Sequence, residues 1–142
     1  MKALTTTTAA STGHPAYSQV LPCAAQSAGE ARRLVLAACG AWGLDELAES
    51  GTLLVSELVG NAVRHTRCQL VRVEVARLGR DRVRISVTDR SAALPVRREP
   101  GDGATCGRGL LVLDALADRW GTDPLAYGKR VWVELVRQHP AP

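Results

Sequence analysis

Apolar residues recur along this chain with two different periods, which predict where its helices and strands lie. Over residues 46–65 they follow helical spacing and form one arc, made of Leu47, Leu54, Val55, Leu58, Val59, Ala62 and Val63. Over residues 69–77 and 82–88 valine and isoleucine instead alternate with polar residues, which predicts two half-buried strands. The stretch 79–81, Gly-Arg-Asp, suits a hairpin turn between them.

The predicted helix ends rest on local chemistry. Ser27 and Glu30 have the spacing of a capping box, so a first helix is predicted over residues 27–41. Gly43 is expected to end this helix, and Asp45 to cap the longer helix that follows.

The remaining segments complete one α/β pattern. A short strand is predicted over residues 17–21, a helix over 107–118, and closing strands over 119–122 and 130–136. The stretch 91–106 contains prolines and glycines, and a loop of that length in a compact domain is usually functional. The fold class predicted is α/β: a two-layer sandwich in which helices cover one face of a mostly antiparallel, mixed sheet.

The chain of 142 residues is long enough for one domain with one core. We predict a flexible tail over residues 1–16, the domain over 17–137 and a short tail over 138–142. The core must be aliphatic, because phenylalanine is absent and aromatic residues make up 4%. The tryptophans are expected to fill the core or its edge: Trp42, Trp120 and Trp132.

Charge and cysteine content narrow the function classes. The net charge is +4, but the arginines are scattered, and few aromatic rings are present to stack on bases, which argues against nucleic-acid binding. No CxxC pair is present, so free thiols are expected rather than zinc ligands or disulfides. No apolar run is long enough to span a bilayer, and a cytoplasmic protein without membrane contact is expected.

Two polar residues on the long predicted helix could carry chemistry. Glu57 and Asn61 are four residues apart and therefore share one flank of the apolar arc. A partly buried carboxylate suits a general base, and a carboxamide oxygen suits Mg²⁺. The alternative is an ordinary polar helix edge.

Two further elements follow along the chain. Asp89 ends a strand, where a carboxylate can accept a hydrogen bond from the exocyclic amine of adenine; the alternative is a plain turn residue. From Gly101 the sequence GDGATCGRGL places glycines and Arg108 at a helix start, which suits phosphate binding. The alternative is a glycine-rich loop with a helix cap.

The order of these elements resembles the ATPase superfamily of gyrase, histidine kinases, heat-shock chaperones and MutL (the GHKL superfamily). The similarity spans residues 17–137 and is strongest in SELVGNAVRHT, TDRSAALP and GRGLLVLDALADRWGT, which begin at Ser56, Thr88 and Gly107. The short stand-alone form resembles the anti-sigma-factor serine kinases of Gram-positive bacteria. The resemblance implies the Bergerat-type ATP-binding fold.

The resemblance also implies roles for individual residues. Glu57 would be the general base and Asn61 a ligand of Mg²⁺, while Asp89 would accept the adenine amine. The rest of the ATP site would be formed by Ser91, Gly107, Arg108, Gly109 and Leu110, with the segment between Asp89 and Gly107 as a lid. Two residues depart from the family pattern: Ser91 replaces a common glycine, and Arg130 replaces a threonine that helps to bind the base through water.

The function implied is that of a protein serine/threonine kinase using ATP and Mg²⁺. It would phosphorylate an anti-sigma-factor antagonist and also bind a sigma factor, and a homodimer is expected. The alternative is a non-catalytic switch, in which nucleotide binding sets the affinity for a partner protein.

Overall fold

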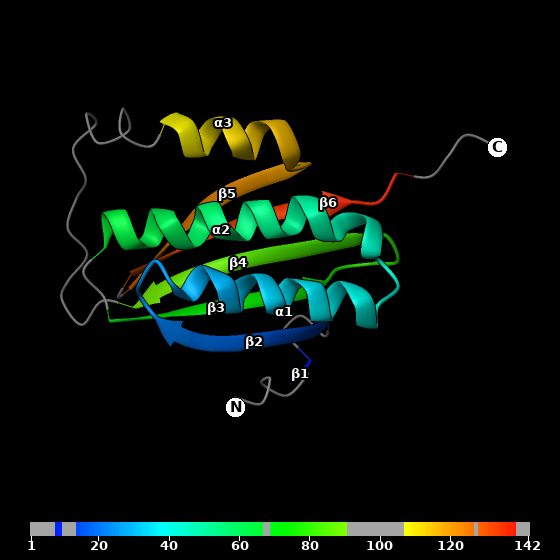
Figure 1. The fold of residues 1–142 in the computed structure, drawn as a ribbon, viewed down its shortest axis with the longest axis horizontal. Coiled ribbons are helices and arrows are strands. Elements are labelled where there is room, and N and C mark those ends of the chain that lie inside the picture. Colours follow the sequence, from blue (N-terminus) through cyan, green and yellow to red (C-terminus); the bar gives the residue numbers. More distant parts are fainter. Residues whose placement is uncertain (1–7, 10–13, 67–68, 91–106, 127, 139–142) are drawn as a thin grey trace.

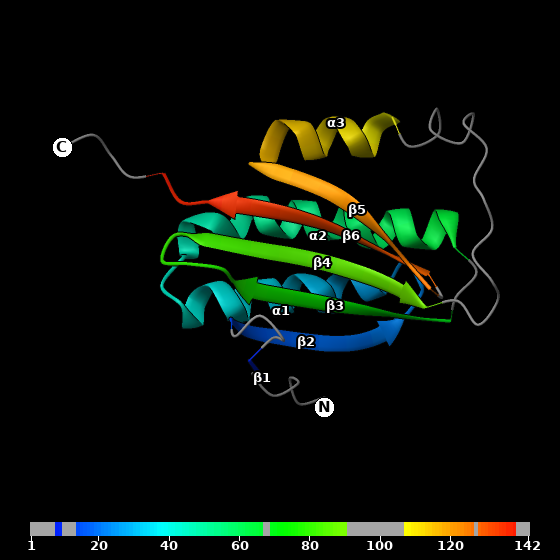
Figure 2. The same cartoon turned by 180° about the vertical axis from the view of Figure 1, so that it is seen from behind.

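A computed structural model describes residues 8–9, 14–66, 69–90, 107–126 and 128–138. The described strands form a six-stranded sheet in the order β1-β2-β3-β4-β6-β5, and each described pair is antiparallel. The helices lie together on one face of this sheet (Figures 1 and 2). The predicted two-layer α/β sandwich is therefore confirmed.

The elements have the following bounds. They are β1 (Thr8–Ala9), β2 (Pro15–Pro22), α1 (Ser27–Ala41), a 3-10 turn η1 (Asp45–Leu47), α2 (Ala48–His65), β3 (Leu70–Arg77), β4 (Arg82–Arg90), α3 (Gly107–Leu116), β5 (Arg119–Leu125) and β6 (Gly128–Val136). The strand predicted over 17–21 is longer at both ends, and β1 falls within the stretch predicted to be a tail.

The core lies between the sheet and the helices, as the alternating valines predict. Their side chains on β3, β4 and β6 are buried: Val71, Val73, Val75, Val83, Ile85, Val87, Val131, Val133 and Leu135. They meet the predicted apolar arc, which lies on α2 apart from Leu47 in η1; all its members are buried except Val63, which is partly buried. Gly51 lets α2 pack closely against α1, because a Cβ there would lie 2.9 Å from Cγ1 of Val35 on α1. Among the described residues, no helix is long and apolar enough to cross a membrane.

The helix ends differ from the sequence prediction. Ser27 forms no capping box, because its hydroxyl donates to the carbonyl of Pro22 at 2.6 Å and the cap residue is Gln26. Asp45 does not cap α2 either: it begins the 3-10 turn that precedes this helix. Gly43 does end the first helix region, with a left-handed φ of +68°.

The cysteines in the described part of the chain are Cys23 and Cys39, and both are free thiols, as the sequence predicted. Cys39 belongs to α1, and its side chain is buried in the core. Burial, and then the charge of Asp45, raise the pKa of this thiol to about 11. Cys39 is therefore neutral at physiological pH and behaves as a small core side chain.

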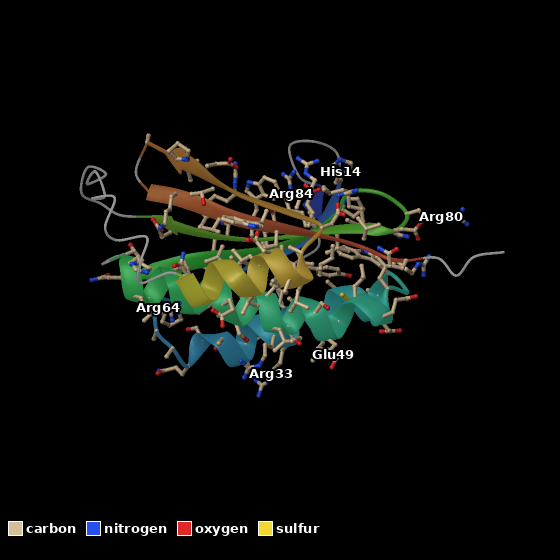
Figure 3. All side chains as sticks on the ribbon, turned by 90° about the horizontal axis from the view of Figure 1, so that it is seen from above. His14, Arg33, Glu49, Arg64, Arg80 and Arg84 are labelled. Atoms are coloured by element: carbon tan, nitrogen blue, oxygen red, sulfur yellow. The ribbon has the colours of Figure 1, made fainter. Side chains whose placement is uncertain are left out.

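The face of the sheet opposite the helices carries a buried charge cluster. Glu134 is 1% exposed and accepts hydrogen bonds from Arg82 (2.7 Å) and Arg84 (2.6 and 3.0 Å). Figure 3 shows Arg84 on this side of the sheet and Arg33 and Glu49 on the helical side. We refer to the face of the sheet opposite the helices as the open face.

The tryptophans divide between the two faces. Trp42 and Trp120 pack against the core, as predicted. Trp132 differs: it lies on the open face over Gly121, with the guanidinium of Arg84 4.7 Å from its ring centre. Trp132 directly precedes the buried Val133 in β6. Because neighbouring side chains of a strand point to opposite faces, its ring lies on the other side of the sheet.

Candidate functional site

Four elements that carry the predicted site residues end or begin at the same end of the sandwich. The C-terminal ends of α2 and β4 lie there together with the N-terminus of α3 and the start of β6 (Figures 1 and 2). We call this the β4 end. The loop between α1 and α2 lies at the opposite end (Figure 1).

Glu57 and Asn61 lie on the flank of α2 that faces α3. Helix α2 lies between α1 and α3 (Figures 1 and 2), and Ser56 marks its α1 side, because Arg32 donates to the Ser56 hydroxyl at 3.0 Å. Glu57 and Asn61 follow roughly 100° and 140° further around the helix, past its outer side. Both are partly buried and stand in the half of α2 nearest the β4 end. The shared flank predicted from the sequence is thus oriented toward α3.

Asp89 lies near the end of β4 with its side chain on the helical face of the sheet. It continues the series Val83, Ile85 and Val87 and is 5% exposed. Its Oδ1 accepts the backbone N–H of Lys129 on β6 at 3.1 Å. The hydrogen bonds among the described residues leave Oδ2 as the acceptor for a further donor. Asp89 is therefore a fixed, buried carboxylate and not a plain turn residue.

Gly128 allows this arrangement and was not singled out from the sequence. Its φ is +151°, a backbone conformation that residues with a side chain rarely adopt. A Cβ at this position would collide with the carbonyl oxygen of Asp89 and lie 2.7 Å from its Oδ1. The glycine in the motif Gly-Lys-Arg was visible, but only strand pairing shows which residue it lies against.

The strand register corrects the prediction made for Arg130. Arg130 pairs with Thr88 and Asp123 and donates to Oδ2 of Asp123 at 3.3 Å, on the open face. The residue directly across from Asp89 is Lys129. Because side chains alternate between faces along a strand, Arg130 points away from the side on which Asp89 lies. Arg130 and Asp89 therefore lie on opposite faces of the sheet, and the structure does not bring their side chains together.

Helix α3 begins at Gly107, as the glycine-rich sequence predicted, and runs to Leu116. Its N-terminus points toward the β4 end (Figure 1), so its first N–H groups and the positive end of its dipole are directed there. Arg108, Gly109 and Leu110 belong to its first turns. Ser91 and the predicted lid, residues 91–106, lie outside the described residues.

The described residues fit ATP and Mg²⁺ by their chemistry. A buried carboxylate with one oxygen already anchored suits an amine donor, and a helix N-terminus suits phosphates. In the described part of the chain, no three His, Cys, Asp or Glu side chains gather into a metal site. The carboxamide oxygen of Asn61 is the kind of ligand that Mg²⁺ accepts.

Comparison with known proteins agrees with this arrangement. Residues 21–134 match the family described as the histidine kinase-like ATPase domain. The match begins in β2 and ends in β6, and it includes every predicted site residue. No curated protein matches the chain. Since the matched region covers most of the chain, this protein belongs to the family of histidine kinase-like ATPase domains, and this membership implies that it binds ATP.

Proposed function

We propose that this protein is a serine/threonine kinase that transfers the γ-phosphoryl group of ATP to a hydroxyl group of a partner protein. The observation that carries the proposal is the shared placement of Glu57 and Asn61. Both lie on the α3-facing flank of α2, in the half nearest the β4 end, where α3 directs its N-terminus. A base and a metal ligand would thus stand beside a phosphate-binding helix end.

Asp89 would select the nucleotide. Its Oδ2 accepts the exocyclic amine of adenine, while Oδ1 stays bonded to the Lys129 amide. A carboxylate that is 5% exposed discriminates strongly, because a buried acceptor left without its donor carries a desolvation cost. Guanine offers a carbonyl oxygen at the equivalent position, which the carboxylate repels. The nucleotide is therefore ATP rather than GTP.

Glu57 would remove the proton of the attacking hydroxyl. That hydroxyl oxygen forms a bond to the γ-phosphorus as the bond to the β,γ-bridging oxygen breaks, and ADP leaves. The partly buried position of Glu57 keeps the carboxylate within the helix layer, on the flank facing α3. Positioning and charge neutralisation supply most of the catalysis in such transfers.

Asn61 would hold Mg²⁺ through its carboxamide oxygen. The ion supplies neutralisation of the phosphate charge when it is bound. The first N–H groups of α3 share that task at the phosphates, since a helix N-terminus carries about half a positive charge. Arg108 belongs to the first turn of the same helix and would add a guanidinium.

The partner would be an anti-sigma-factor antagonist, with a sigma factor bound by the same chain and a homodimer as the working form. This part of the proposal rests on the resemblance of the sequence motifs to those of stand-alone serine kinases of that class, while the family match supports the ATPase domain alone.

The test separates chemistry from binding with two variants. Glu57→Gln should keep Mg-ATP affinity and lose phosphoryl transfer by a factor of about 100 to 10,000, because the amide keeps the shape but cannot take a proton. Asn61→Ala should weaken Mg²⁺-dependent binding and transfer together. The assays are calorimetry with Mg-ATP and transfer of labelled phosphate to purified candidate antagonists.

Ser56→Ala is the matched control, because Ser56 is next to Glu57 but on the α1 side of the helix. It should change neither readout. Transfer by Glu57→Gln at the unaltered rate would remove the base assignment. ATP binding with no transfer to any antagonist would favour the non-catalytic switch.

A further inference from the structure

Lys129 lies directly across from Asp89 in the pairing of β4 with β6. Residues directly opposite on neighbouring antiparallel strands share one face of the sheet, with Cβ atoms about 4.5–5.5 Å apart. Asp89 lies on the helical face, so the Lys129 side chain begins on that face as well. The side chain that starts beside the carboxylate proposed to select the base therefore carries a positive charge.

The backbone of Lys129 also fixes the geometry of the pair. Its N–H donates to Oδ1 of Asp89, and Gly128 gives the strand the close approach that this bond needs. The position of the Lys129 backbone relative to Asp89 is therefore set by strand pairing, while its four-carbon side chain can reach beyond the carboxylate. The backbone of Lys129 thus supplies a fixed donor to Oδ1, and its side chain starts on the same face of the sheet.

The adenine edge carries two adjacent polar groups of opposite kind. The exocyclic amine is a donor, and the neighbouring ring nitrogen N1 is an acceptor. A carboxylate oxygen satisfies the first, and an ammonium group satisfies the second. Guanine presents the reverse order, with a carbonyl oxygen and a protonated ring nitrogen, so the same pair of side chains would oppose it.

We propose that Lys129 is a specificity-determining residue that donates a hydrogen bond to N1 of adenine, beside the amine accepted by Asp89. The inference rests on the adenine role of Asp89 in the proposed function, and it does not depend on phosphoryl transfer. It replaces Arg130 with Lys129 as the second residue that reads the base.

The test compares Mg-ATP with Mg-1-deaza-ATP, in which N1 is replaced by C–H. For the unaltered protein, calorimetry should show about 10- to 150-fold weaker binding of the deaza compound, the range for a hydrogen bond to a charged group. In Lys129→Met this ratio should fall to less than about threefold, because the donor is gone. Because both affinities are measured on the same protein, any effect of the substitution that is common to the two nucleotides cancels in their ratio.

Arg130→Met is the matched control: the same change of side chain one residue further on, on the open face. It should keep the full ratio of the unaltered protein, and melting curves should show that both variants are folded. An equal ratio in the unaltered protein and in Lys129→Met, whether large or close to one, would overturn the role of Lys129.

Asp89→Asn distinguishes the failure of this inference from that of the adenine assignment. If Asp89→Asn weakens ATP binding while Lys129→Met leaves the deaza ratio unchanged, Asp89 reads the base without Lys129. If neither substitution alters ATP binding or the deaza ratio, the base lies elsewhere, and both assignments fail together.

Discussion

Replacing Gly128 by alanine should damage ATP binding and stability together. A Cβ at this position would collide with the Asp89 carbonyl oxygen and lie 2.7 Å from its Oδ1, so either β6 or the end of β4 must move. The φ of +151° adds a backbone cost of roughly 1–3 kcal/mol for a residue with a side chain. At about 3–5 °C per kcal/mol for a domain of this size, the melting temperature should fall by about 3–15 °C.

The loss of affinity follows from the displaced carboxylate. Asp89 would lose its alignment with the Lys129 amide and with the adenine amine, and a hydrogen bond to a charged group contributes about 1.5–3 kcal/mol. Binding of Mg-ATP should therefore weaken about 10- to 150-fold. Calorimetry on the folded variant, well below its melting temperature, measures this loss separately from the loss of stability.

Two other glycines provide matched controls. Gly43 also has a positive φ, +68°, but a Cβ there would meet no atom within 4 Å, and it lies at the end of the sandwich away from the β4 end. Gly43→Ala should thus lower the melting temperature and leave ATP affinity unchanged. At Gly79, in the turn before β4, a Cβ would also meet no atom within 4 Å. Gly79→Ala should change neither the melting temperature nor the ATP affinity. Unaltered ATP affinity in a folded Gly128→Ala protein would refute the placement of adenine at Asp89.

Two further predictions concern single carboxylates. Asp89→Asn should bind Mg-ATP about 10- to 150-fold more weakly and should narrow the preference for ATP over GTP, measured by calorimetry; equal affinities for the two nucleotides in the unaltered protein would contradict it. Burial would raise the pKa of Glu134, but hydrogen bonds from Arg84 and Arg82 lower it below its ordinary value. The charged Glu134 therefore stabilises the fold fully above the unfolded pKa of about 4.3, and this stabilisation is lost as the pH falls through the lower folded pKa. Glu134→Gln should accordingly be about 1.5–3 kcal/mol less stable in urea at pH 7, and this difference should shrink in acid. A difference independent of pH would show that it does not come from the charge of Glu134.

The sequence alone determined the elements and the kinds of chemistry they carry. Helical and strand periods are local properties, so the apolar arc of α2 and the alternation of β3 and β4 were predictable from residue spacing. The shared flank of Glu57 and Asn61 follows from the geometry of a single helix and needed no tertiary contact. The strand end at Asp89 and the helix start at Gly107 were visible in the same way.

Only the tertiary structure decided which residues meet. The pairing of β4 with β6 places Lys129 across from Asp89 and turns Arg130 to the open face, and a shift of one residue would exchange them. The hydroxyl of Ser27 has the right spacing for a cap but bonds to Pro22, which a β2–α1 turn brings within reach. The strand register depends on contacts between segments distant in the chain, and no local period encodes which strand lies beside which or in what register.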